Sequence, residues 1–236
     1  PLLDQWALAS LNELTTKVTR YYEEYDFYKA YHALNNFYTV TLSATYLDVL
    51  KDRLYTWDKQ GIHRKASQTV FFEIYTHLTK MMAPILSFLG EEIYTYFPDD
   101  LKKESIFLES FPKPNKDWDQ PEVMKTFATL LDVRSEVSKV LEPMRKDKLI
   151  GSSLDAEITI TGPSETIDLL KNYQGSQTLD HLKELFIVSD VKLESGDNKE
   201  LTVTARKSTG DKCPRCWHYS KNLVKVDAYI DVCPKC

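Results

Sequence analysis

The sequence lacks any apolar run long enough to cross a membrane, and its first residues do not have the pattern of a secretory leader. No stretch of its 236 residues approaches the roughly 20 consecutive apolar residues that span a bilayer. The first ten residues, PLLDQWALAS, contain neither the basic nor the apolar segment of a signal peptide. We therefore expect a cytoplasmic protein without a membrane partner. Because it starts at Pro1 without Met, we also expect a piece excised from a longer chain.

Catalytic motifs are also missing. The sequence contains no P-loop, no GxGxxG and no HExxH. Glu91 and Glu92 are adjacent, so on a helix they point in different directions and do not form an acid–base pair. Four histidines stand apart from any Ser, Cys or carboxylate arrangement, and each is expected to be structural or exposed: His32, His63, His77 and His181. No catalytic centre is predicted.

Net positive charge is absent as well. The chain has 30 Lys and Arg against 35 Asp and Glu, a net charge of -5, which gives no global reason to expect nucleic acid. Only residues 206–236 are basic, with seven cationic against three acidic residues. Hydrophobic residues make up 42% and charged residues 28%, which indicates a folded chain and excludes disorder.

Helical periodicity dominates the first half. Apolar residues return to one face at 3.6-residue spacing and predict helices over 2–25, 27–54 and 63–82. Pro84 must remove one helical hydrogen bond, so a break is expected at its N-terminal side and a new helix after it, ending at Phe97. Three to four antiparallel helices of this kind predict a bundle.

The pattern changes in the second half. Residues 98–121 carry prolines and mixed charge without a period, which indicates a linker, and 122–148 is helical again, with Pro143 expected to perturb its last turns. After Gly151, strands are predicted in DAEITITG, LFIVSDVKLE and LTVTARKS, with helices over 164–173 and 178–185 between them. The expected domains are 1–110, helical; 111–150, linker and long helix; 151–207, small α/β; and 208–236, metal-binding.

All four cysteines lie in the last 24 residues. Cys213-Pro-Arg-Cys216 and Cys233-Pro-Lys-Cys236 are separated by sixteen residues, the spacing of a four-cysteine zinc site. Two residues between the thiols let a tight turn direct both sulfurs at one ion about 2.3 Å away. Four thiolates complete the tetrahedron and leave no position for water, so one structural Zn2+ is predicted.

Other interpretations of this segment stay open. A single redox Cys-x-x-Cys pair, disulfides in an oxidising compartment, or His218 as a ligand could also account for part of the pattern. The hairpin could be a stabilising cap, or it could contact unpaired bases through Arg215 and Trp217. Lys51 and Arg53 fit either an ion-paired face or an RNA contact, and Lys148 fits either a phosphate site or a helix C-terminus.

Five segments of the chain match a known pattern in content and in order. They are FYKAYHALNNFYTVTLSATYLDVLKDRLY, RKASQTVFFEIYTHLTKMMAPILSFLGEEIYTYFP, VRSEVSKVLEPMRKDKLIGSSLDAEITI, LDHLKELFIVSDVKL, and GDKCPRCWHYS with VCPKC. Together they strongly resemble the C-terminal third of bacterial isoleucyl-tRNA synthetases, and the resemblance covers essentially the entire chain. The cysteine segment alone is shared with formamidopyrimidine-DNA glycosylases.

The resemblance implies a multi-domain, mainly α fold: a helical-bundle anticodon-binding domain, a small α/β junction domain and a zinc hairpin. Such enzymes ligate isoleucine to tRNA with ATP and Mg2+, but their HIGH and KMSKS motifs and their editing domain do not occur here. This segment is therefore not expected to aminoacylate. The implied partners are the anticodon stem-loop of isoleucine tRNA and the rest of the synthetase, and a monomer is expected.

The resemblance also implies site residues. The zinc ligands carry over as Cys213, Cys216, Cys233 and Cys236. The candidate RNA contacts are Arg215, Trp217, Lys51, Arg53 and Lys148. A zinc-capped helical scaffold that binds another protein, without RNA, is the main alternative.

Overall fold

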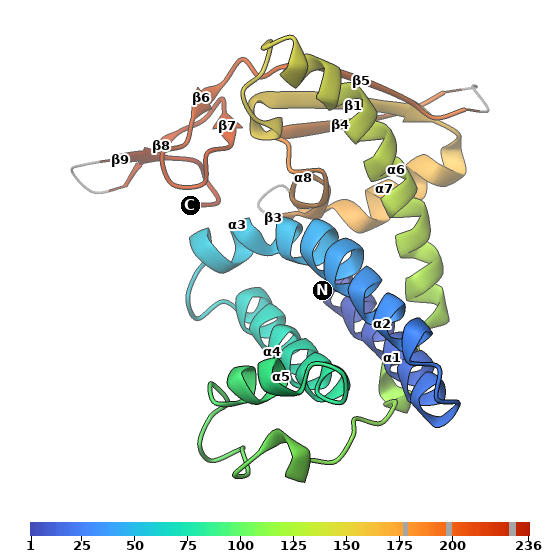
Figure 1. Cartoon of the computed structure of the whole chain (residues 1–236). Coiled ribbons are helices and arrows are strands. Elements are labelled where there is room, and N and C mark those ends of the chain that lie inside the picture. The colour runs from blue at the N-terminus through green and yellow to red at the C-terminus, as the bar shows by residue number, and fades with distance from the viewer. Residues whose placement is uncertain (177–178, 197–199, 227–229) are drawn as a thin grey trace. The chain divides into compact units, whose positions relative to one another are not determined.

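The computed structural model describes residues 1–176, 179–196, 200–226 and 230–236 (Figure 1). Over those ranges, no helix combines the length and apolar character that crossing a membrane requires. By contacts the chain forms two compact units, Pro1–Asp48 with Lys59–Met124, and Val49–Asp58 with Lys125–Cys236. The four-domain division expected from the sequence stays a prediction.

The first unit is a helical bundle, as predicted. Its elements are α1 (Leu2–Glu23), α2 (Phe27–Asn36), η1 (Phe37–Leu47), α4 (Ile62–Met82), α5 (Ser87–Tyr94) and the short 3-10 turns η2 (Ile106–Leu108) and η3 (Lys116–Trp118). Helix α1 packs against α2, η1 and α4. Its stripe of Leu11, Leu14 and Val18 is buried, as are Ile74 and Leu78 on α4. Burial of these stripes accounts for the fold of the bundle.

The predicted break before Pro84 is present. Helix α4 ends at Met82, and the amides of Ile85 and Leu86 bond to the Met82 carbonyl in a turn that leads into α5. A Cβ atom at Gly90 would lie 3.0 Å from the Cβ of Ala83, so the absent side chain lets α5 approach this turn closely. Helix α5 ends at Tyr94, three residues before the predicted end at Phe97.

The predicted single α-helix over 27–54 is wrong in its middle. The chain stays helical from Phe27 to Thr56, but η1 is a π-helix, and only α2 and α3 (Asp48–Thr56) are α-helical. The buried residues of η1 include Phe37, Leu42 and Tyr46. The five-residue step from Phe37 to Leu42 fits the wider π turn, in which hydrogen bonds join residues five apart.

A buried carboxylate joins three helices of the first unit. Asp4 of α1 is 3% exposed and accepts hydrogen bonds from the Tyr46 hydroxyl of η1 at 2.6 Å and from Ser67 Oγ of α4 at 3.1 Å. Hydrogen bonding compensates the cost of burying these polar groups. The network also fixes the rotation of η1 against its neighbours, because each donor must face the same carboxylate.

The second unit contains a three-stranded sheet. Its strand order is β4 (Asp190–Ser195), β1 (Ala156–Gly162), β5 (Thr202–Lys207), with β1 parallel to β4 and antiparallel to β5. The chain between β1 and β4 forms α7 (Ser164–Gln174) and α8 (His181–Phe186), which pack against the sheet (Figure 1). Ile158 and Ile160 of β1 are buried with Ile167 and Leu170 of α7. The small α/β module is confirmed.

Several boundaries in this unit differ from the prediction. The expected strand over 185–194 begins only at Asp190, because Leu185 and Phe186 belong to α8 and Ile187 adopts a left-handed φ of 55° that ends the helix. The helix expected over 178–185 begins at His181, capped by the Asp180 side chain, and residue 178 lies outside the described ranges.

The long helix α6 (Pro121–Lys146) continues through Pro143 to Lys146. The pyrrolidine ring lacks an N–H, and Pro143 is exposed, so the Lys139 carbonyl that would have accepted from it can be hydrated. Phe127, Leu130 and Val137 line the buried face of the helix. The remaining strands form two-residue or three-residue hairpins: β2 (Gly175–Ser176) with β3 (Leu179–Asp180), β6 (Asp211–Lys212) with β7 (Tyr219–Ser220), and β8 (Val224–Val226) with β9 (Ile230–Val232).

An ion pair lies in the interior of the second unit. Arg53, on the part of α3 that belongs to this unit, is 0% exposed and donates from Nε and Nη2 to the two carboxylate oxygens of Glu184 at 2.9 and 2.8 Å. Burial acts to raise the pKa of Glu184, but hydrogen bonds and charge from His181 and Arg53 outweigh it, so the pKa lies below its ordinary value. The bidentate geometry ties α3 to α8.

Replacing Tyr46 by Phe is expected to lower the free energy of unfolding by about 1–3 kcal/mol, because the buried Asp4 carboxylate loses a donor. Urea denaturation followed by circular dichroism measures the change. Tyr31→Phe removes a hydroxyl from a ring that is 49% exposed and should shift stability by less than about 0.5 kcal/mol. Equal effects of the two substitutions would contradict the role given to Asp4.

Replacing Arg53 by Met is expected to cost about 3–5 kcal/mol, because Glu184 is left buried without its partner. The double variant with Glu184→Leu should recover part of that loss. Lys171→Met is the matched control, since its pair with Asp168 is 51% and 65% exposed, and it should cost at most about 1 kcal/mol. A loss for Arg53→Met no larger than the control's would show that the buried pair does not stabilise the unit.

Candidate metal centre and nucleic-acid interface

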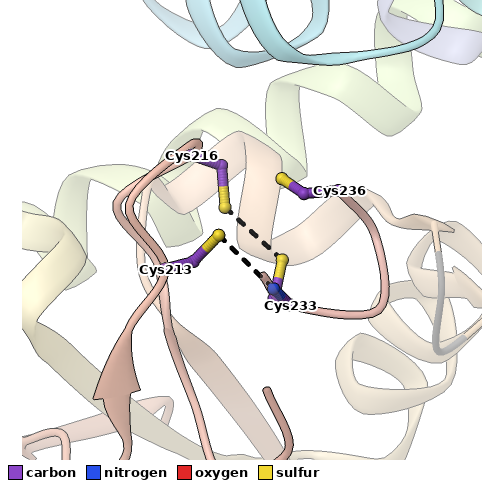
Figure 2. A group of neighbouring side chains, drawn as sticks. All are labelled: Cys213, Cys216, Cys233 and Cys236. Atoms are coloured by element: carbon purple, nitrogen blue, oxygen red, sulfur yellow. Dashed lines mark hydrogen bonds between the residues drawn. The ribbon is translucent and has the colours of Figure 1, made fainter. Parts of the chain in front are cut away.

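Four thiols converge at the end of the chain. The sulfur atoms of Cys213, Cys216, Cys233 and Cys236 all lie within 4.8 Å of one another, with Cys216 and Cys233 at 3.5 Å (Figure 2). Figure 2 shows the four side chains directed toward a common centre. Three of the thiols are buried and that of Cys236 is half-buried.

Two tight turns position the thiols. The first follows β6: the Cys213 amide donates to the His218 carbonyl, and the Trp217 amide donates back to the Cys213 carbonyl, both at 2.9 Å. Trp217 adopts a left-handed φ of 66°, which closes this turn and lets the chain return as β7. The second turn follows β9, where the Cys236 amide donates to the Cys233 carbonyl at 2.9 Å. We call these turns the first and second knuckles, 213–217 and 233–236.

The thiols fit a tetrahedral metal. Four sulfurs about 2.3 Å from one ion lie close to 3.8 Å apart, which agrees with the spread of this cluster. Hydrogen bonding to Cys233 raises the pKa of Cys216 to about 12, and the same contact lowers the pKa of Cys233. The thiols therefore resist ionising together, and a divalent cation among them would offset that repulsion. His218 is outside the cluster, since its Nδ1 contacts the Cys216 carbonyl at 3.2 Å.

Among the residues of this segment that the structure describes, little apolar material is buried. Besides the cysteines, its buried cluster contains Val232, with Leu223 packed against it. Such a small core contributes too little to order a segment of this length, so the metal supplies folding free energy here.

Both knuckles contact the end of α3 through cations. Arg215 donates from Nε and Nη2 to the Thr56 carbonyl at 3.1 and 2.8 Å, where the C-terminal end of the helix dipole favours positive charge. Lys235 forms an ion pair with Asp52. Burial acts to raise the pKa of Asp52, but the charge and hydrogen bond of Lys235, together with His218 and Thr56, outweigh it and lower the pKa. These two contacts fix the metal-binding segment against α3.

A pocket of about 180 Å³ lies beside these contacts. Its lining comes from α3 and α8 with the residues that follow them, from β7 and from the second knuckle, and includes Asp52, Trp57, Ser189, His218 and Lys235. Sequence patterns gave no signal for it, because its residues come from four separate segments. Neither Asp52 nor Lys235 was a candidate site residue on its own.

The candidate RNA contacts divide into two groups. Trp217 is 61% exposed on the first knuckle with the Lys212 ammonium 5.5 Å from its ring centroid, and Lys51 and Lys148 are exposed. Arg215 is exposed, although its guanidinium already donates to Thr56. The expectation for Arg53 is corrected, because its guanidinium is buried against Glu184 and does not reach the surface. The charge pattern along a helix does not show which of its cations are exposed and which are buried.

Two family models match the chain. The model described as "Anticodon-binding domain of tRNA ligase" matches residues 4–160, and the model described as "Zinc finger found in FPG and IleRS" matches residues 210–236. The second match covers both knuckles, and with the four-thiol cluster it supports Zn2+ as the structural cofactor of this segment.

Similar curated proteins carry the name isoleucine–tRNA ligase. They include those of Carboxydothermus hydrogenoformans, 40% identical over 240 residues, Thermotoga neapolitana, 39% identical over 240 residues, and Natranaerobius thermophilus, 37% identical over 249 residues. Each alignment covers 99% of this chain but only 25% or 26% of the relative. The chain thus spans about a quarter of the length of these relatives. The helical bundle of the first unit agrees with the family match over residues 4–160. The chain belongs to the family of anticodon-binding domains of tRNA ligases.

Proposed function

We propose that the chain binds tRNA as the C-terminal part of an isoleucyl-tRNA synthetase and contacts the anticodon stem-loop of isoleucine tRNA. The observation that carries the proposal is the anticodon-binding match over residues 4–160, extended by relatives named isoleucine–tRNA ligase over 99% of the chain. Ligation of isoleucine, with its need for ATP and Mg2+, would belong to the remaining three quarters of such an enzyme. We also propose a cytoplasmic location and a monomeric state.

The four cysteines are proposed to hold one Zn2+, with Cys213 and Cys216 from the first knuckle and Cys233 and Cys236 from the second. The ion would supply no chemistry to a substrate, because four thiolates fill its coordination sphere. Its effect is to fix the first knuckle, and with it the exposed ring of Trp217, on a rigid support.

The RNA surface is proposed to centre on Trp217. An exposed indole offers a flat face on which an unpaired base can stack, and Lys212 beside it adds positive charge. Lys51 and Lys148 would contact phosphates from exposed positions. Arg215 would add positive charge to the same knuckle, and its hydrogen bond to the Thr56 carbonyl would fix the orientation of its guanidinium. Arg53 is left out of this surface because it is buried.

A band-shift titration with isoleucine tRNA tests the function. The wild-type chain should bind, and binding should weaken when an anticodon base is changed or when salt is raised. Trp217→Ala should weaken binding roughly tenfold or more, because base stacking is lost, while the zinc content stays the same. Tyr96→Ala, which truncates a ring that is 79% exposed on the first unit, is the matched control and should leave affinity unchanged.

If the chain binds no tRNA at low salt, the proposal is overturned. That result would favour the alternative, in which the chain is a zinc-capped helical scaffold that binds another protein. If Trp217→Ala binds as tightly as the wild-type chain, the indole is not a stacking platform.

Replacing Cys213 by Ser is expected to release zinc and loosen residues 210–236, because three thiolates no longer complete the tetrahedron. Metal analysis after dialysis should fall well below one zinc per chain, while the far-ultraviolet helical signal is largely kept. His218→Ala should retain stoichiometric zinc, since the imidazole faces the Cys216 carbonyl and not the sulfur cluster. Retention of zinc by Cys213→Ser, or its loss from His218→Ala, would contradict the ligand set.

A further inference from the structure

Helix α3 is buried at its start and more open at its end. Residues 49–58 group with the second unit, whereas the residues on either side of them group with the first. The helix has three buried residues within its first six positions, Val49, Leu50 and Arg53. None of residues 54–58 is buried. Burial and the pair with Glu184 therefore hold the start of the helix, and its end needs other contacts.

The end of α3, residues 52–58, is held by a network centred on Asp52. Thr56 Oγ1 donates to Asp52 Oδ1 at 2.7 Å, and the Trp57 indole donates to Asp52 Oδ2 at 3.0 Å. The same carboxylate pairs with Lys235. A negative charge near the C-terminal end of a helix is unfavourable by itself, because the last carbonyls already form the negative pole of the helix dipole. The ammonium of Lys235 offsets that charge.

A second cation caps the helix. The last carbonyl groups of a helix have no amide of the same helix to accept from. Arg215 supplies two donors to the Thr56 carbonyl, from Nε at 3.1 Å and from Nη2 at 2.8 Å. Arg215 thus acts on α3 as a capping residue does, although it is 159 residues away in sequence.

Both cations belong to the knuckles. Arg215 and Lys235 are each the third residue of a Cys-x-x-Cys sequence. The position of each cation therefore depends on the turn that directs two thiols toward the metal. In the part of this segment that the structure describes, little apolar surface is buried besides the cysteines, so the turns have little else to fix them when the metal is removed.

We propose that zinc orders the end of α3 through these two cations, so that metal occupancy controls a helix end that contributes no ligand to the metal. With zinc bound, both knuckles are fixed and present Arg215 to Thr56 and Lys235 to Asp52. Without zinc the knuckles loosen, the two cations leave, and residues 52–58 open locally while the buried start of the helix stays in place. The inference rests on the proposed zinc ligands and goes beyond RNA binding.

The coupling is reciprocal. Contacts that α3 makes only in the zinc-bound state also strengthen the hold on zinc, because two linked equilibria favour each other by the same factor. The end of α3 therefore supports the metal site without touching the metal.

The same contacts build the pocket of about 180 Å³ beside α3. Its lining includes Asp52 and Trp57 from the end of α3, and His218 and Lys235 from the metal-binding segment. Loss of the metal separates these two walls, so the pocket exists only in the zinc-bound state.

Amide hydrogen exchange, measured on the chain with stoichiometric zinc and again after chelation, tests the coupling. The amides of residues 54–56 should exchange roughly tenfold faster or more without zinc, because local opening of the helix end becomes frequent. Helix α7 is the internal control and should keep its exchange rates, since it packs on the sheet with Ile167 and Leu170 buried.

Unchanged exchange in α3 overturns the proposal. Equal acceleration in α7 also overturns it, because zinc would then stabilise the whole unit and not one helix end. A chain that takes up no zinc overturns the ligand set, and this inference with it. No RNA is present in the assay, so the coupling and tRNA binding can fail separately.

Substitution of the two cations gives an independent test. The double variant of Arg215→Met and Lys235→Met keeps all four cysteines and should hold one zinc per chain. Its residues 54–56 should nevertheless exchange as fast as those of the zinc-free wild type. Lys221→Met is the matched control, because it removes an exposed cation of the same segment outside both knuckles, and it should leave α3 protected. If α3 stays protected in the zinc-loaded double variant, zinc does not act through these cations and the proposal is wrong.

Discussion

Four sulfur atoms take the place of a hydrophobic core at the end of this chain. The segment from about residue 210 has two short hairpins and, in the part that the structure describes, little buried apolar material besides the cysteines. Its fold depends on the convergence of two knuckles that lie sixteen residues apart in sequence. A metal that joins them converts two weak hairpins into one rigid element, and the position of Trp217 follows from that rigidity.

Helix α3 provides the support on which this element rests. The same nine-residue helix is tied to α8 by the buried Arg53–Glu184 pair, to the second knuckle by Asp52 and Lys235, and to the first knuckle by Thr56 and Arg215. Each contact is a charge-assisted hydrogen bond, so its direction is fixed as well as its energy. Asp52, Arg53 and Thr56 of α3 thus hold other elements of the second unit in place, and the ring of Trp217 stays exposed.

Much of the architecture was predictable because it depends on local patterns. Periodicity located the bundle, Pro84 located the break between α4 and α5, and period-two alternation located β1 and β5. The π-helix η1 was missed because its buried positions Leu42, Thr45 and Tyr46 lie three and four residues apart, as they would in an α-helix. The start of β4 was predicted too early in the sequence, because a short apolar run does not distinguish the buried end of a helix from a strand.

Spacing along the chain was enough to predict most of the helices and strands and the convergence of the four thiols, because both depend on local patterns. Which cations reach the surface depends instead on contacts between distant segments. Arg53 and Lys51 lie two residues apart in one charged segment, yet Arg53 is buried by Glu184, which is 131 residues away in sequence, and Lys51 is exposed. Burial of a charge depends on the partner that folding brings to it, and nothing in the neighbouring sequence identifies that partner.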